Sequence, residues 1–263
     1  MSIVDRLIPP SGLKVLITGG AAGIGAMIAQ GFHEASARVY ICDIDARAVD
    51  LMLAKHAGMH GAVADVGVRN DVDRIMDDAA TALGGLDVLI NNAGIAGPTG
   101  NIEDLDPAAW EHTISTNLNS QFYFLRKAVP YLKASSHNAN IVLMSSVAGR
   151  LGYPFRTPYA ATKWAIVGLM KSLANELGPD NVRINAVLPG VVDGDRMSRV
   201  IQDRAKVLGI GESDMRNQYL EKISLRRMVT MEDIAAMALF LSSPAATNIT
   251  GQAISVDGNV EYL

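Results

Sequence analysis

The chain has 263 residues, of which 49% are hydrophobic and 19% charged, a composition that excludes an intrinsically disordered protein. Its 23 basic and 27 acidic residues give a net charge of -4, which argues against a nucleic-acid partner or an anionic membrane surface. The single cysteine, Cys42, suits a reducing compartment, and the sequence has no signal-peptide pattern and no apolar run long enough to span a membrane. We therefore expect a soluble, cytoplasmic, globular protein.

Short β-branched segments alternate with amphipathic segments along the chain. Strands are predicted at Lys14–Thr18, Arg38–Cys42, Gly61–Ala64, Leu86–Asn91, Ile141–Ser145, Val182–Leu188 and Gln252–Val256. Helices are predicted at Ile24–Ala35, Ala46–His56, Asp71–Leu83, Pro107–Ile114, Leu118–Leu132 and Pro158–Leu177. Such alternation is typical of βαβ units, in which helices cover both faces of a parallel sheet. We predict a single doubly wound, Rossmann-type α/β domain over residues 1–263 with a seven-stranded parallel sheet.

A glycine-rich segment, TGGAAGIG at Thr18–Gly25, lies between the first predicted strand and its helix. The glycines permit positive φ and a close approach of a pyrophosphate, while the helix N-terminus supplies free N–H groups and the positive end of its dipole. The spacing G-x-x-x-G-x-G is a variant of the dinucleotide fingerprint. Because glycines alone also fit an ordinary tight turn, the position in the first βα turn is what favours nucleotide binding.

Asp43 closes the second predicted strand, 18 residues after Gly25. A carboxylate at this position can bind the 2′-hydroxyl of the adenosine ribose and would repel a 2′-phosphate. Ala22 stands in the turn where an arginine would favour that phosphate. NAD(H) is therefore favoured over NADP(H), although Asp43 also fits a solvated acid at a strand end. Cys42 fits a packed strand residue better than a reactive thiol.

Tyr159 and Lys163 form a Y-x-x-x-K pattern. Thr157 is predicted as the N-cap and Pro158 as the first helical residue, which places Tyr159 in the first turn. The spacing of four puts Lys163 on the same helix face. A nearby ammonium and a helix N-terminus both lower the pKa of a phenol, as a general base near neutrality requires. The pattern is common, however, and also fits an exposed helix face.

Ser146 follows the fifth predicted strand and precedes Tyr159 by 13 residues. The carboxyl ends of parallel strands are where open α/β sheets bind ligands, so Ser146 is a candidate donor to a developing oxyanion. The alternative is a simple hydrogen bond to backbone at the end of a strand.

Taken in chain order, these motifs resemble those of the short-chain dehydrogenase/reductase family along nearly the whole length. The matching segments are Thr18–Gly25, Asp43, Asp65-Val66, NNAG at Asn91–Gly94, Asn117, Ser146, YAATK at Tyr159–Lys163, Pro189-Gly190 and TGQAISVDG at Thr250–Gly258. The resemblance implies that Tyr159 is the general acid/base, that Lys163 lowers its pKa and binds the nicotinamide ribose, and that Ser146 holds the substrate oxygen. Asn117 would order a water that relays protons through Lys163.

The resemblance also implies a set of cofactor contacts, in which Asp65 meets the adenine and the Pro189-Gly190 segment borders the nicotinamide. The expected cofactor-binding residues are Gly19, Gly23, Ile24, Gly25, Asp43, Ile44, Asp65, Val66, Asn91, Ala93, Gly94, Tyr159, Lys163, Pro189, Gly190 and Val192. No metal is expected, because Gly58 weakens any helix that would bring His56 and His60 together as ligands.

The segment Val192–Lys222 is expected to form the substrate flap of such an enzyme. Its six basic and six acidic residues indicate no net preference for an acidic substrate. Within this segment, Gly194 stands where members of the family often have a threonine that contacts the nicotinamide carboxamide. The resemblance therefore implies that this contact is lost, shifted or made by backbone. Arg150, Tyr153 and Arg156, in the loop between Ser146 and Tyr159, are candidates for lining the pocket, although loop surface is the preferred interpretation for the two arginines.

We predict an oxidoreductase that transfers a hydride between NAD(H) and a secondary alcohol or ketone of a small polar substrate, such as a polyol, sugar or hydroxy acid. A homotetramer or dimer is expected, with subunits paired through the helices near 118–132 and 158–177. One alternative is an NADPH-dependent 3-oxoacyl thioester reductase, which Asp43 argues against. Another is a catalytically silent nucleotide-binding protein, which the intact set Asn117, Ser146, Tyr159 and Lys163 argues against.

Overall fold

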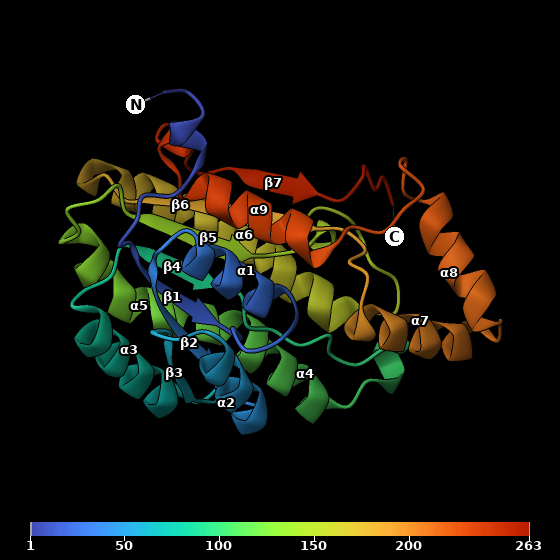
Figure 1. Ribbon diagram of the computed structural model, residues 1–263. Helices are drawn as coiled ribbons and strands as arrows, with labels where there is room; N and C mark the ends of the chain where they lie inside the picture. The colour runs from blue at the N-terminus through green and yellow to red at the C-terminus, as the bar shows by residue number, and fades with distance from the viewer. Residues whose placement is uncertain (1, 263) are drawn as a thin grey trace.

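A seven-stranded parallel sheet forms the centre of the computed structural model, which describes residues 2–262 (Figure 1). Its strand order is β3-β2-β1-β4-β5-β6-β7. The strands are β1 (Lys14–Thr18), β2 (Arg38–Asp43), β3 (His60–Val63), β4 (Val88–Asn91), β5 (Asn140–Met144), β6 (Arg183–Pro189) and β7 (Ala253–Val256). The predicted Rossmann-type fold is confirmed, and the predicted strand ends differ from the observed ones by one or two residues.

The strand order reverses between β1 and β4, which lie side by side with Ile17 paired to Ile90. Successive residues of β1 point to opposite faces: Leu16 packs into the core on one side of the sheet, and Val15 and Ile17 into the core on the other. All these side chains are fully buried. In an open α/β sheet, the point where the strand order reverses leaves a crevice at the carboxyl ends of the strands, and ligands bind there.

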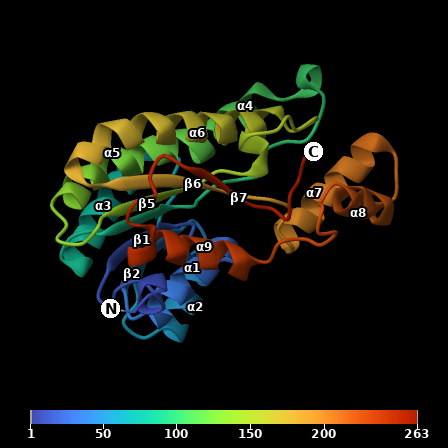
Figure 2. The ribbon, with the colours of Figure 1, turned by 90° about the horizontal axis from the view of Figure 1, so that it is seen from above.

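Helices cover both faces of the sheet (Figure 2). One face carries α3 (Arg69–Leu83), α4 (Pro107–Ile114), α5 (Ser120–Lys133) and α6 (Thr157–Leu177). The other carries α1 (Gly23–Glu34), α2 (Ala46–Lys55) and α9 (Met231–Leu241). A π-helical turn at Ser115–Asn119 links α4 to α5, so the helix predicted from Leu118 begins as a regular α-helix only at Ser120.

Helix α9 was not predicted from the sequence, because MEDIAAMALFL is apolar through most of its length and shows little amphipathic periodicity. A capping box in which Thr230 and Asp233 exchange hydrogen bonds marks its start. The helix packs along α1 at Gly31, where a Cβ would lie 2.8 Å from Leu239. This close approach joins the last part of the chain to its first helix.

The predicted substrate flap contains two helices, α7 (Asp195–Leu208) and α8 (Glu212–Glu221), which project beyond the carboxyl ends of the strands (Figure 1). They enclose a small core of their own, in which Ile201, Met215 and Tyr219 pack against Val147. The flap is therefore a structured cover over the edge of the sheet where the site residues gather. Among residues 2–262, no helix is both long enough and apolar enough to cross a membrane.

Candidate active site

The glycine-rich turn lies between β1 and α1, and its backbone fits a pyrophosphate. Gly19 and Gly23 have φ angles of +60° and +55°, in the left-handed region that glycine adopts readily. A Cβ on Gly25 would collide with the backbone of Gly19, so only glycine fits there. The N-cap, Ala22, offers no side-chain oxygen to the first turn of α1, which leaves its N–H groups and positive dipole end for an anion. Ile24 follows in that first turn.

Asn92 and Thr18 hold this turn against the end of β4. Asn92 Nδ2 donates to the carbonyl oxygens of Thr18 (3.0 Å) and Gly19 (3.1 Å). Thr18 Oγ1 accepts from the N–H groups of Asn92 (3.0 Å) and Ala93 (2.9 Å). Sequence reasoning assigned no role to Asn92, although it stands inside the NNAG motif.

Asp43 ends β2 beside the glycine-rich turn. One carboxylate oxygen accepts from the N–H of Ala21 (3.1 Å) and the other from the N–H of Asp45 (3.3 Å). The carboxylate therefore reaches back over the turn, as a group that contacts the ribose of a bound dinucleotide would. Ile44, the next residue, is exposed.

Asp65 and Val66 follow the neighbouring strand, β3. Asp65 Oδ1 accepts from the N–H of Gly67 (2.8 Å), and its own N–H donates to Asp71 (2.9 Å). Val66 is buried, so its side chain packs into the core and only its backbone faces the edge where a cofactor would lie.

Helix α6 places Tyr159 and Lys163 at the carboxyl ends of β4 and β5. The helix begins at Thr157 with Arg156 as its N-cap, so the predicted N-cap at Thr157 is wrong by one residue, while Tyr159 does lie in the first turn. The Lys163 ammonium lies 5.5 Å from the centre of the Tyr159 ring and donates to the carbonyl oxygen of Met144 (2.8 Å). Both side chains thus share one helix face.

The surroundings of Tyr159 favour its phenolate form. Burial acts to raise the pKa of Tyr159, but the charge of Lys163, hydrogen bonding with Ser146 and the charge of Arg196 outweigh it, so the pKa lies below its ordinary value. Burial disfavours the charged form of Lys163 and so lowers its pKa, although the neighbouring phenol of Tyr159 acts to raise it. Each group therefore shifts the other, and the two titrate as a pair.

Ser145 and Ser146 follow β5 directly and have different partners. Ser145 Oγ donates to the carbonyl oxygen of Lys163 (2.8 Å), which fixes α6 against the strand end. Ser146 Oγ accepts from the N–H of Ala148 (3.2 Å) and also lines a cavity next to Tyr159. The hydrogen bond to backbone at the strand end is thus present, and donation to a developing oxyanion stays a prediction.

Asn117 lies in the π-helical turn and is fully buried. Its Oδ1 accepts from the N–H of Ile95 (2.7 Å), and its Nδ2 donates to the carbonyl oxygen of Ile95 (3.0 Å) and to Thr162 Oγ1 (3.3 Å). The side chain thus clamps the segment after β4. A Cβ on Gly94 would lie 3.1 Å from Asn117 Oδ1 and 3.6 Å from Lys163 Nζ, so the backbone runs close to both. The water relay through Lys163 stays a prediction.

The other predicted cofactor residues fall into two groups. The Asn91 side chain points into the core, where its Nδ2 donates to the carbonyl oxygen of Gln121 (3.1 Å). Pro189 ends β6, and a Cβ on Gly190 would lie only 2.6 Å from Asp257 Cα. Val192, the remaining member at this end, forms a bridge with Val229. Gly194, which was not among the predicted cofactor residues, is the N-cap of α7 with φ +144°.

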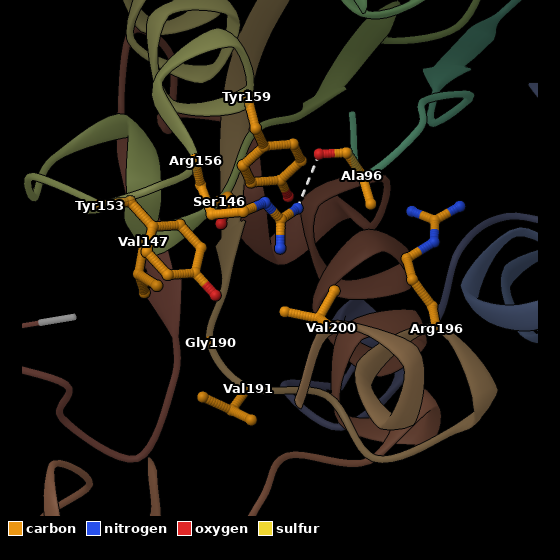
Figure 3. A pocket seen from close by; sticks show the side chains of 10 residues that line it. All are labelled: Ala96, Ser146, Val147, Tyr153, Arg156, Tyr159, Gly190, Val191, Arg196 and Val200. Atoms are coloured by element: carbon orange, nitrogen blue, oxygen red, sulfur yellow. Dashed lines mark hydrogen bonds between the residues drawn. The ribbon is translucent and has the colours of Figure 1, made fainter. Parts of the chain in front are cut away.

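A cavity of about 70 Å³ lies beside Tyr159 and Ser146, with Arg156 across it (Figure 3). The interpretation of Arg156 as loop surface is wrong: it is 2% exposed, because its guanidinium stacks on the rings of Tyr153 (5.3 Å) and Tyr159 (5.2 Å). Its Nη2 donates to the carbonyl oxygen of Ala96 (2.6 Å).

Two other arginines lie near this cavity. Arg196 lines the cavity from α7 and donates to the carbonyl oxygen of Gly94 (2.8 Å); sequence reasoning assigned it no role. Arg150 is exposed and pairs with Asp257 (2.8 Å), outside the cavity, as predicted.

Cys42 and His56, which the sequence analysis assigned to no chemistry, lie in structural positions. Cys42 is buried in β2, and burial raises the pKa of its thiol to about 12. His56 packs against His33 with ring centres 5.2 Å apart, and it lies just past the end of α2, whereas His60 begins β3. The two histidines at i and i+4 therefore do not share a helix face.

The glycine-rich turn, the Tyr159–Lys163 pair and the adjacent cavity define an oxidoreductase that uses a nicotinamide dinucleotide. A family model described as enoyl-(acyl carrier protein) reductase matches residues 19–260. A probable galactose dehydrogenase of Rhizobium meliloti is 34% identical over 251 residues, covering 94% of each chain. A 3-oxoacyl-[acyl-carrier-protein] reductase of Chlamydia muridarum is 35% identical over 251 residues, covering 93% of this chain and 96% of the relative.

Among solved structures, a 7α-hydroxysteroid dehydrogenase complexed with NADH and 7-oxo glycochenodeoxycholic acid superposes with a TM-score of 0.88. It is 30% identical, and the match covers 99% of this chain and 98% of that one. The chain belongs to the short-chain dehydrogenase/reductase family, and it is an oxidoreductase that acts on CH–OH groups.

Proposed function

We propose that the protein transfers a hydride between NAD(H) and a secondary alcohol or ketone of a small polar substrate. The observation that carries the proposal is the placement of Tyr159, with its lowered pKa, beside Ser146 at one cavity. Bound nicotinamide would accept or supply the hydride. Tyr159 Oη takes the proton from the substrate hydroxyl during oxidation and returns it during reduction. Ser146 Oγ holds the substrate oxygen, and Lys163 keeps the phenol acidic.

NAD(H) is proposed over NADP(H) because of Asp43. Its carboxylate accepts a hydrogen bond from the N–H of Ala21, at the place where the adenosine ribose of a bound dinucleotide would lie. A ribose hydroxyl can donate to that carboxylate, whereas a 2′-phosphate would be repelled by it. The relative described as a 3-oxoacyl reductase supports the thioester alternative. Asp43 counts against the NADPH form of that alternative.

The cofactor proposal is tested by titrating NADH and NADPH into the protein and following the fluorescence of the reduced nicotinamide. The wild type is expected to bind NADH more tightly. Asp43→Ala should erode the ratio of the two dissociation constants by roughly 10–100-fold, the worth of hydrogen bonds to a charged group. Asp50→Ala removes the same charge from the exposed surface of α2 and serves as the matched control. An unchanged ratio in Asp43→Ala shows that this carboxylate is not the selector.

The chemistry is tested by turnover with a panel of polyols, sugars, hydroxy acids and simple secondary alcohols. Tyr159→Phe should lose most of the turnover that the wild type shows while it still binds NADH. Full activity in Tyr159→Phe contradicts the role given to the phenol. Turnover by no member of the panel, with NADH still bound, would favour the silent nucleotide-binding alternative.

We also infer that copies of the chain pair through α5 and α6. These two helices belong to the layer that covers one face of the sheet (Figure 2). Phe122 and Trp164 are 53% and 51% exposed on them, and Tyr131 adds a third exposed ring on α5. Exposed large apolar side chains on these two helices support a homodimer or homotetramer. The buried free thiol of Cys42 supports the reducing, cytoplasmic compartment that we propose.

A further inference from the structure

The cavity at Tyr159 is lined by two arginines and by no carboxylate. Its lining residues are Ala96, Ser146, Val147, Tyr153, Arg156, Tyr159, Gly190, Val191, Arg196 and Val200. Among residues 2–262, no carboxylate oxygen lies within 4.0 Å of a guanidinium nitrogen of Arg156 or Arg196, so neither arginine forms an ion pair there. Even when Tyr159 is ionised, the two arginines leave the lining of the cavity with a positive charge that no carboxylate of the described part of the chain neutralises.

Of the two arginines, Arg156 gives the stronger evidence for a bound anion, because its side chain is buried. Its recorded hydrogen bond runs from Nη2 to Ala96, while its Nε is buried without a partner in the described structure. Buried polar groups are nearly always hydrogen-bonded, and a buried cation without an anion is costly. Figure 3 shows the guanidinium reaching into the cavity between the rings of Tyr153 and Tyr159. The guanidinium thus lies at the cavity where a substrate would bind, and its hydrogen-bonding capacity is only partly used by the described part of the chain.

A third arginine adds positive charge behind the wall of the cavity. Arg204 is 4% exposed, its Nη1 donates to Tyr219 Oη (3.0 Å), and its Nε has no partner in the described structure. The Tyr219 hydroxyl shares a hydrogen bond with the Tyr153 hydroxyl (2.6 Å). Burial raises the pKa of Tyr153, which keeps this phenol neutral. Tyr153 therefore does not supply the missing negative charge.

The acidic residues of Val192–Lys222 do not compensate, although their number equals that of the basic residues. Asp193 faces Arg216 (3.5 Å) and Glu212 accepts from Gln202 (3.1 Å), and neither lines the cavity. The balance of charge that composition shows for Val192–Lys222 therefore does not extend to the cavity, which two arginines and no carboxylate line.

We propose that this cavity binds the carboxylate of its substrate through Arg156 and Arg196, an inference that rests on the proposed function of the same site. The fork of a guanidinium matches the two oxygens of a carboxylate. The guanidinium carbon of Arg156 lies 5.2 Å from the centre of the Tyr159 ring, so a carboxylate bound by Arg156 would lie within a few atoms of the reacting carbon. The small volume of the cavity, about 70 Å³, favours a compact acid. The substrate is thus a short hydroxy acid or oxo acid, in preference to a polyol or sugar.

The first test measures binding without turnover. Acetate and its neutral counterpart acetamide are titrated into the protein–NADH complex at constant ionic strength, and the nicotinamide fluorescence is followed. Saturation with NADH occupies the phosphate site, so any further anion must bind elsewhere. Acetate should bind at least ~10-fold more tightly than acetamide. Equal binding of the two overturns the proposal. Should NADH fail to bind, the same pair is compared on the protein alone by thermal stability.

Variants assign the acetate site. Arg156→Gln and Arg196→Gln should each weaken acetate binding by roughly 10–100-fold, whereas Arg199→Gln removes an equal charge from the exposed surface of α7 and should change it by less than about twofold. Because Arg196 is exposed, its variant keeps the test open if Arg156→Gln does not fold. Acetate binding that resists both substitutions, or that falls equally in Arg199→Gln, overturns the proposal.

Turnover separates this inference from the proposed function. For a short 3-hydroxy acid and its methyl ester, the ratio of kcat/KM values should favour the acid, and Arg156→Gln should lower that ratio by roughly 10–100-fold. Turnover of neutral alcohols and esters in preference to acids leaves the proposed function standing and overturns the carboxylate site. Tight acetate binding with no turnover of any alcohol supports the carboxylate site and counts against the proposed function.

Discussion

Replacing Asn117 by alanine should destabilise the protein and loosen the segment after β4. The Asn117 amide makes three hydrogen bonds: two part-buried ones with the backbone of Ile95 and one buried one with Thr162. Alanine removes them all and leaves the N–H and carbonyl groups of Ile95 without these partners. Since that segment passes beside Lys163, the substitution reaches the reactive centre through the backbone and not through substrate contact.

The size of the effect follows from these bonds. Each net hydrogen bond contributes about 1 kcal/mol, and each buried group left unsatisfied costs about 1–3 kcal/mol. Thr162 Oγ1 keeps its bond to the carbonyl oxygen of Tyr159 (2.7 Å), so the third bond contributes least. We expect Asn117→Ala to lower the free energy of unfolding by about 3 kcal/mol.

The assay is equilibrium urea unfolding of wild type and variants at one protein concentration. Asn119→Ala is the matched control, because Asn119 lies in the same π-helical turn but is exposed and makes no capping hydrogen bond. Its free energy of unfolding should stay within about 0.5 kcal/mol of the wild type. If Asn117→Ala loses less than about 1 kcal/mol, the clamp on Ile95 is not what Asn117 contributes, and the hydrogen-bond reasoning fails.

The remaining predictions concern pH and assembly. The phenolate of Tyr159 is the base for alcohol oxidation, and the pKa of Tyr159 is lowered. We therefore expect kcat/KM for oxidation to be at its full value above that pKa and to fall as the pH drops through it. Lys163→Met should move this limb to higher pH, and an unmoved limb contradicts the coupling. Trp164→Glu places a charge on an exposed position of α6 and should lower the molar mass measured by light scattering. An unchanged mass removes α6 from the subunit interface.

The elements that the sequence predicted well are those whose signal is local. Alternating strands and helices follow from hydrophobic periodicity, and the turn at Thr18–Gly25 follows from glycines that the backbone requires. Tyr159 and Lys163 follow from a spacing of four on one helix. The missed helix α9 had a local signal as well, the capping box of Thr230 and Asp233, but its nearly uniform apolar character hid the periodicity.

Arg156 shows what local reasoning does not reach. An arginine in a loop ordinarily faces water, and no local pattern around Arg156 specifies which groups would bury it. Its burial depends on Tyr153 and Tyr159 stacking against it and on the carbonyl oxygen of Ala96, which comes from a loop 60 residues earlier in the chain. The position of Arg196 against Gly94 depends in the same way on the packing of α7 over the sheet edge.

The packing of α9 along α1 has a consequence for the order in which the protein is made. The N-terminus of α1 follows the glycine-rich turn. Its buried residues Ile28 and Phe32 share a core with Ile234 and Ala238 of α9. A ribosome that adds 5–20 residues per second needs about 10–40 s to reach α9 after completing α1. Throughout that interval the nascent chain shows an uncovered apolar helix face. The part of this face that α9 covers is therefore closed only after residues 231–241 have been made.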